Sequence, residues 1–203
     1  MFNNIFRFKF IMVASLLFLA NISCFKYDEE CLKYQNYFIA EFDGYFIEPG
    51  WNNGLTFGDR YGLHVFQAPD NPNSWRISFK INTREDMEFN MFFSNIESTG
   101  EYPIETGTYE DAVTNPFSKN MMFIRDGSLF GGGSDENTYI YFSKGNSGNI
   151  SITAYNQESG IIKGTFQGQI YSIENEEEIH ISGEFDIDLQ TLNDMENNKP
   201  CWL

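Results

Sequence analysis

The chain has 203 residues and a formal net charge of −16 at pH 7, because 29 aspartate and glutamate residues outnumber 13 lysine and arginine residues. A chain this acidic, without a basic cluster, is a poor candidate for binding nucleic acid or for lying on an anionic lipid surface. Its 21 phenylalanines, 11 tyrosines and 17 glycines favour strands and turns over helices.

The first 23 residues have the pattern of a signal peptide. Arg7 and Lys9 precede an apolar run over 10–20, and no acidic residue occurs before Asp28. A run this short is more typical of a signal-peptide core than of a transmembrane helix, which needs about 20 apolar residues. We therefore predict export with residues 1–23 as the signal peptide, and their removal would change the formal charge from −16 to −18 because it takes away Arg7 and Lys9.

A cysteine follows this signal peptide directly, with the small residue Ser23 before Cys24. A cysteine at this place resembles the lipobox of bacterial lipoproteins, in which the chain is cut before the cysteine and acyl chains are attached. The resemblance implies that the Cys24 thiolate forms a thioether and that two or three acyl chains anchor the protein to the membrane. Asn21 and Ile22 depart from the usual pattern, and the alternatives are an ordinary cleaved signal peptide or an uncut anchor.

Two cysteines, Cys31 and Cys201, remain if lipid occupies Cys24. An exported domain lies in a compartment where disulfides persist. We predict a bridge between these two thiols, since this pairing leaves no odd thiol. It would join the start of the domain to its end and stabilise it by up to ~5 kcal/mol. Two free thiols are the alternative.

Residues 24–36 are polar and acidic, with K-Y-D-E-E at 26–30, and are predicted to be a spacer between the membrane and a single domain over 37–203. The segment 26–30 also resembles the short lysine-plus-acidic signal that follows the lipidated cysteine in surface-exposed lipoproteins of Bacteroidetes-type bacteria. This resemblance implies exposure on the outside of the outer membrane.

The domain is predicted to be all-β, an antiparallel β-sandwich of about ten strands. A hairpin over 38–48 turns at Asp43-Gly44. The segments 75–82 and 87–93 alternate apolar and polar residues, which predicts one buried face and one face in solvent. Further strands are expected at 62–67, 121–125 and 138–143, and turns are expected at 68–74 and at Asp126-Gly127. The segment 49–62 is predicted to be a loop with a short strand at 55–57, and 94–117 a connection with short paired segments. A flexible loop is expected over 131–137.

The final third predicts a three-stranded meander over 149–156, 161–173 and 179–189. Gly164 and Gly168 in its middle strand indicate a bulge or close packing. The segments G-N-I-S-I-T-A-Y, G-T-F-Q-G and I-S-G-E-F-D-I, together with F-I-A-E-F-D-G-Y-F, resemble an uncharacterised lipoprotein family of Bacteroidetes-type bacteria. The family implies an exported β-sandwich of unknown activity and supplies no catalytic residue.

No catalytic, metal or cofactor motif stands out. The G-N-S-G at 145–148 lacks the spacing of G-x-S-x-G and is interpreted as a turn. His180 shares the polar face of its strand with Glu184 and Asp186, where a metal site or a general base can be imagined, although a chance strand-face arrangement explains it better. His64 is interpreted as a core or edge histidine. Trp51, in a loop rich in glycine and asparagine, is the one candidate ligand contact.

These observations predict a non-catalytic lipoprotein of the bacterial cell envelope, anchored to the outer membrane through Cys24 and acting by binding an envelope partner or an extracellular ligand. The alternative is a carbohydrate-binding module of a glycan-uptake system, which would need exposed aromatic side chains. A hydrolase that uses paired carboxylates or His180 is the third reading.

Overall fold

A computed structural model describes residues 36–54, 58–81, 87–126, 139–174 and 177–195. The chain divides into two compact units, Met1–Tyr34 and Gln35–Leu203, and every described residue lies in the second. The predicted signal peptide and the three cysteines Cys24, Cys31 and Cys201 lie outside the described residues.

The second unit is built almost entirely of β-strands. In chain order they are β1 (Tyr37–Phe42), β2 (Tyr45–Ile47), β3 (Trp51–Gly54), β4 (Gly58–Tyr61), β5 (His64–Ala68), β6 (Asn71–Lys80), β7 (Met87–Phe93), β8 (Gly100–Pro103), β9 (Met121–Asp126), β10 (Tyr139–Ser143), β11 (Asn149–Asn156), β12 (Ile161–Ser172) and β13 (Glu178–Asp188). The helices described are α3 (Tyr109–Thr114), the 3-10 turn η1 (Pro116–Ser118) and α4 (Leu189–Met195). None of these three has the length and apolar character that crossing a membrane requires.

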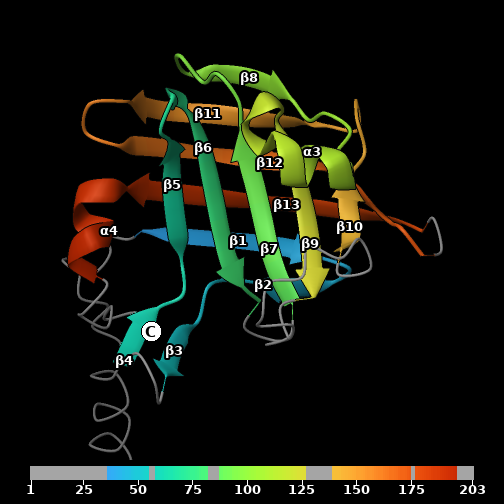
Figure 1. Ribbon diagram of the computed structural model, residues 1–203, viewed down its shortest axis with the longest axis horizontal. Coiled ribbons are helices and arrows are strands. Elements are labelled where there is room, and N and C mark those ends of the chain that lie inside the picture. The colour runs from blue at the N-terminus through green and yellow to red at the C-terminus, as the bar shows by residue number, and fades with distance from the viewer. Residues whose placement is uncertain (1–35, 55–57, 82–86, 127–138, 175–176, 196–203) are drawn as a thin grey trace, which may run out of the picture. The chain divides into compact units, whose positions relative to one another are not determined.

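Eleven of the described strands form one continuous antiparallel sheet in the order β2-β1-β13-β12-β10-β9-β7-β6-β5, with β11 and β8 following on from β12. In Figure 1, β5, β6, β7 and β9 form a front layer that runs across β11, β12, β13 and β1 behind it. Because β10 pairs with both β9 and β12, the sheet passes from one layer to the other without a break. The predicted all-β antiparallel fold is confirmed, and its two layers belong to one curled sheet.

The core lies between the two layers. The alternation predicted for β6 and β7 is confirmed, since Trp75, Ile77, Phe79 and Ile81 and, on the neighbouring strand, Phe89, Met91 and Phe93 are all buried. Phe38 of β1 connects the layers, because its ring lies 5.0 Å from that of Phe79 and 5.4 Å from that of Phe166 on β12. Buried aromatic rings remove about 150–250 Å² each from water, so these contacts hold the curled sheet closed.

The outer face of the front layer was expected to lie in solvent, and this is wrong for part of it. Phe92, Met121, Phe123 and Phe142 form a second buried cluster, against which Tyr109, Ala112 and Phe117 pack. These last three come from α3 and η1, within a segment that the sequence predicted as a connection. The helix begins because the Thr108 side chain accepts a hydrogen bond from the Asp111 backbone N–H at 3.1 Å, which caps its first turn.

Polar residues on the same outer face are also buried. Asn90 is 0% exposed and Ser78 is 4% exposed. The side chain of Arg76 lies against Asn90, whose Oδ1 accepts hydrogen bonds from Arg76 Nε at 3.0 Å and Nη2 at 2.7 Å. The guanidinium also lies 5.6 Å from the centre of the Phe92 ring. A polar outer position is therefore buried without loss of its hydrogen bonds.

The N-terminal hairpin is confirmed, with Asp43 and Gly44 at φ of 51° and 73° between β1 and β2. The predicted loop over 49–62 is wrong, because β3 and β4 pair with each other there, while its expected strand at 55–57 lies outside the described residues. The predicted turn over 68–74 is shorter than expected, because β6 begins at Asn71. Asp126 ends β9, while Gly127 and the predicted loop over 131–137 lie outside the described residues.

The C-terminal meander is confirmed, since β11 pairs with the part of β12 from Ile161 to Gln167, and β12 pairs with β13 from Ile161 to Tyr171. Gly164 packs so closely that a Cβ atom there would overlap the carbonyl oxygen of Ser151. The register of β11 shifts between Ile152 and Ala154, opposite this glycine. Both predicted reasons for a glycine, close packing and a bulge, therefore apply at this position.

Candidate functional site: a polar groove on the meander

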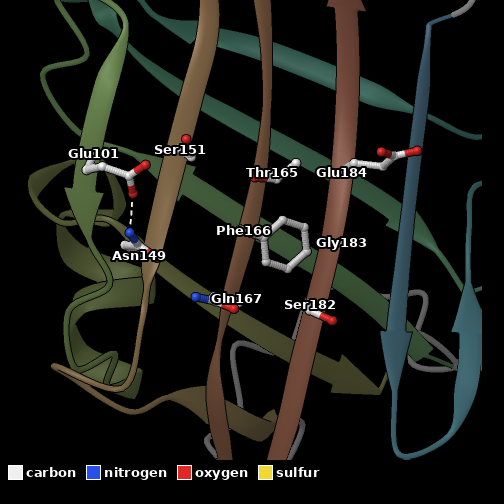
Figure 2. A pocket seen from close by; sticks show the side chains of 9 residues that line it. All are labelled: Glu101, Asn149, Ser151, Thr165, Phe166, Gln167, Ser182, Gly183 and Glu184. Carbon is white, nitrogen blue, oxygen red and sulfur yellow. Dashed lines mark hydrogen bonds between the residues drawn. The ribbon is translucent and has the colours of Figure 1, made fainter.

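An open groove lies on the outer face of the back layer and has a volume of about 550 Å³. It crosses β8, β11, β12 and β13, as Figure 2 shows. The described residues that line it are Glu101, Asn149, Ser151, Thr165, Phe166, Gln167, Ser182, Gly183 and Glu184. Most of them carry hydroxyl, amide or carboxylate groups.

Strand register places these side chains in two rows across the sheet. In the first row Glu101 pairs with Ser151, Ser151 with Thr165, and Thr165 with Glu184. In the second row Asn149 pairs with Gln167, and Gln167 with Ser182. Because side chains alternate between the faces of a strand, the residues between the rows point into the core, and the groove side stays polar.

Beneath the groove, β12 and β13 pack closely around Gly183. Gly183 has no side chain, and a Cβ atom there would lie 2.8 Å from Cε1 of Phe166. Phe166 is 3% exposed, and Figure 2 shows its ring beside Gly183 between the two strands. Gly183 is an inward-facing position of β13, so its missing side chain makes room for the Phe166 ring on the core side of the sheet, beneath the groove.

The two carboxylates of the first row differ in their surroundings. Glu101 accepts a hydrogen bond from Nδ2 of Asn149, across the end of the groove. Figure 2 shows the Glu184 carboxylate directed toward β1, away from Glu101. There it meets Tyr37, and burial, the negative charges of Glu184 and Asp186, and a hydrogen bond to Glu184 raise the pKa of the Tyr37 hydroxyl above its usual value.

The two glutamates of the first row do not turn their carboxylates toward each other. Glu101 and Glu184 stand three strands apart in one row, so their Cα atoms are about 14 Å apart. Glycoside hydrolysis needs two carboxyl groups that face the same bond, with roughly 5–9.5 Å between the carboxyl groups themselves. The Glu184 carboxylate turns toward β1 instead of toward Glu101. The described lining also holds no histidine or lysine beside the hydroxyls of Ser151 and Thr165. Such a hydroxyl needs an adjacent base to become a nucleophile.

The second row continues beyond the groove onto the N-terminal hairpin. Ser182 pairs with Glu41 of β1, and Glu41 pairs with Phe46 of β2. Phe46 is 64% exposed, the highest value among the exposed large hydrophobic residues of the described chain. An aromatic side chain thus stands at the end of a row of polar ones.

The residues singled out from the sequence lie elsewhere or outside what is described. Trp51 begins β3, but its side chain is outside the described part, and Cys24, Cys31 and Cys201 lie outside it altogether. His64 is exposed on β5, at the end of the sheet order, so the edge interpretation is confirmed over the core one.

His180 is exposed and pairs with Gln169. The two carboxylates expected near it have other partners, because Glu184 accepts a hydrogen bond from Tyr37 and Asp186 binds Lys163 at 2.7 Å. In the residues that the structure describes, no three histidine, cysteine, aspartate or glutamate side chains gather as a metal site would require.

Sequence reasoning did not identify the groove. The polar positions of the three meander strands were visible as alternation, and Glu184 was noted only as a neighbour of His180. What was missing is the register that aligns Thr165 with Ser151 and Glu184, and the pairing of β8 with β11 that adds Glu101.

No protein-family model matches this sequence, and the chain matches no curated protein and no solved structure.

Proposed function

We propose that this chain is a lipid-anchored protein of the bacterial cell envelope that acts without catalysis, by binding an envelope partner or an extracellular ligand in the groove on its meander. The observation that carries the binding role is the groove itself, a polar hollow of about 550 Å³ across four strands. Concave sites with a few convergent polar groups are the usual places where proteins bind small ligands or chain segments.

The envelope location is supported by the sequence. The apolar run over 10–20 precedes Cys24 in the manner of a lipoprotein signal, and the meander segments resemble the Bacteroidetes-type lipoprotein family. Several acyl chains on Cys24 would hold the protein at the outer membrane.

A second candidate function is a carbohydrate-binding module of a glycan-uptake system. The groove's hydroxyl, amide and carboxylate groups favour it, since these complement sugar hydroxyls, which both donate and accept hydrogen bonds. The exposed ring of Phe46 on the same face also favours it. The stacking residue expected from the sequence was Trp51, whose side chain is not among those described.

The binding role is tested by filling the groove. Thr165 is exposed at the centre of the lining, so Thr165→Arg projects a long side chain into the groove without changing the core. Thr153→Arg, an exposed residue of β11 outside the lining, is the matched control. The full chain, purified in mild detergent, is titrated with the envelope fraction and with the extracellular polysaccharide fraction of its host.

Saturable binding to one fraction that Thr165→Arg weakens by at least about tenfold, with Thr153→Arg unchanged, supports the proposal. If Thr165→Arg binds as well as Thr153→Arg and the wild type, or if neither fraction shows saturable binding, the proposal is contradicted. The anchor is tested separately by labelled palmitate incorporation into the wild type and Cys24→Ser, with protease accessibility on whole cells. A mature protein whose first residue is not cysteine, or that carries no acyl mass, contradicts the anchor alone.

A further inference from the structure

We infer that the groove binds an uncharged, extended polysaccharide that lies across the strands along the second row, from Asn149 through Gln167, Ser182 and Glu41 to the ring of Phe46. This inference rests on the proposed binding role of the groove and adds to it the chemical class and the direction of the ligand.

The spacing of the side chains along the second row supports this inference. Neighbouring strands lie about 4.8 Å apart, so a row of paired residues presents one side chain at each such step. This step is close to the length of one pyranose unit in an extended, β-linked chain. A glycan laid at right angles to the strands would therefore meet one polar side chain per sugar. The coiled chain of an α-linked glucan does not keep this straight repeat.

Several side chains that line the groove also have unused hydrogen-bonding capacity. Within the described residues, the side chains of Gln167, Ser182, Ser151 and Thr165 form no hydrogen bond, although Ser182 and Ser151 are half-buried. Gln167 offers two donors and an acceptor, and each hydroxyl offers one donor and two acceptor positions. These groups can therefore bind sugar hydroxyls without first breaking contacts inside the protein.

The negative charge along the two rows favours a neutral ligand. Glu101, Glu184 and Glu41 lie along the two rows, and the described lining contains no cation. Lys163, on the same face, is already paired with Asp186 at 2.7 Å. A whole-chain charge of −16 adds a repulsive field at low salt. Polysaccharides that carry carboxylates or sulfates are thereby disfavoured, whereas neutral ones are not.

The exposed ring at the end of the second row offers a different kind of contact. Phe46 is 64% exposed on β2 and pairs with Glu41. The C–H face of a sugar placed over this ring would remove apolar surface of both partners from water. The polar row and the ring together offer the two kinds of contact that a sugar presents, hydroxyl groups at its rim and C–H groups on its face.

The experiment measures retardation of the full chain in native gels that contain one dissolved polysaccharide and a mild nonionic detergent. The probes are hydroxyethyl cellulose and glucomannan as neutral extended chains, glycogen as a neutral α-linked one, and polygalacturonate as an anionic one. Phe46→Ala is matched by Phe66→Ala, which removes a ring that is 52% exposed on the front layer. Gln167→Ala is matched by Gln157→Ala in the exposed turn before β12.

The inference expects retardation by hydroxyethyl cellulose or glucomannan and not by glycogen or polygalacturonate. Phe46→Ala and Gln167→Ala should each weaken this retardation by up to about tenfold, with the two controls unchanged. Thermal unfolding of all four variants shows whether a loss of retardation comes from weaker binding or from altered folding. The comparison of the four polysaccharides needs only the wild-type chain.

Absence of retardation by both neutral extended chains overturns the inference, as does equal retardation by glycogen or by polygalacturonate, or an equal loss in Phe46→Ala and Phe66→Ala. If the glycan inference is overturned in one of these ways while Thr165→Arg still loses binding to the envelope fraction, the groove is a binding site for something other than a glycan. The failure of the glycan assignment is thus distinguishable from the failure of the proposed function.

Discussion

The side-chain amide of Asn36 donates a hydrogen bond to the hydroxyl oxygen of Thr191, 155 positions further along the chain, at 2.9 Å. Its Oδ1 also accepts a hydrogen bond from the backbone N–H of Asp188 at 2.6 Å. Asn36 is 1% exposed, although the sequence placed it at the end of a solvated spacer. One buried amide therefore joins the start of β1 to the end of β13 and the first turn of α4.

Replacing this amide should destabilise the domain. In Asn36→Ala the partly buried N–H of Asp188 loses its acceptor, and leaving such a polar group unsatisfied costs about 1–3 kcal/mol. The free energy of unfolding, measured with urea, should fall by this amount. Thr191→Ala removes only one of the two bonds and should cost less. A double-mutant cycle between the two positions should show coupling, and purely additive effects would contradict the contact.

The glycine beneath the groove should be intolerant of a methyl group. In Gly183→Ala the new Cβ would lie 2.8 Å from both Ala40 Cβ and Phe166 Cε1, and it would overlap the carbonyl oxygen of Ile39. Overpacking of this kind costs about 1–3 kcal/mol. Ser182→Ala, one position away on the groove face, should change stability by less than about 0.5 kcal/mol. Equal stability of the two variants in urea unfolding would show that β13 yields to the methyl group.

Stability should fall at alkaline pH partly through Tyr37. Burial, together with the charges of Glu184 and Asp186 and the bond to Glu184, raises the pKa of its hydroxyl in the folded state. The unfolded chain then loses this proton first, near pH 10, so the contribution is complete below about pH 10 and is lost as pH rises through the folded-state pKa. Tyr37→Phe should give a shallower fall of the unfolding free energy above about pH 10.

Salt provides the control for this pH effect. The part that comes from Glu184 and Asp186 should weaken in about 1 M salt, where the Debye length is about 3 Å, while the part due to burial stays. Burial also raises the pKa values of Tyr155 and Tyr171, so some alkaline loss should remain in Tyr37→Phe. An unchanged slope in this variant would mean that Tyr37 does not contribute.

The predicted Cys31–Cys201 bridge is testable on the whole chain. Alkylation under denaturing conditions, followed by mass spectrometry, should leave both thiols unmodified unless a reductant is added first. Reduction should lower the free energy of unfolding by up to about 5 kcal/mol, because it releases a long closed loop. The Cys31→Ser and Cys201→Ser variants should match the reduced wild type. Alkylation of both thiols without reductant would establish free cysteines instead.

Several elements were predictable because their signals are local. From Trp75 in β6 to Ile81 just after it, alternation places every second side chain in the core, and this period needs no knowledge of the neighbouring strands. The Asp43-Gly44 turn needs φ > 0 at both positions, which this pair of residues allows, and the structure has it. The meander followed for the same reason, since short turns force consecutive strands to pair.

Other elements were missed because their stability comes from distant partners. Helix α3 is only six residues long, and its apolar side consists of Tyr109 and Ala112 alone. It exists where Thr108 caps it and where it covers the second buried cluster, with Phe117 of the adjoining η1 turn packing on Phe92 at 5.3 Å. A helix this short is marginal in isolation, so only packing decides that it forms.

The amino-acid sequence by itself determined that this chain forms antiparallel strands with one apolar face, because side-chain alternation along a strand is written in consecutive residues. Only the tertiary structure decided that β10 joins both layers into one sheet and that Glu101, Thr165 and Gln167 line a common groove. The reason is that strand register and the pairing of distant strands depend on the free energy of packing the whole core, which no local stretch of sequence contains.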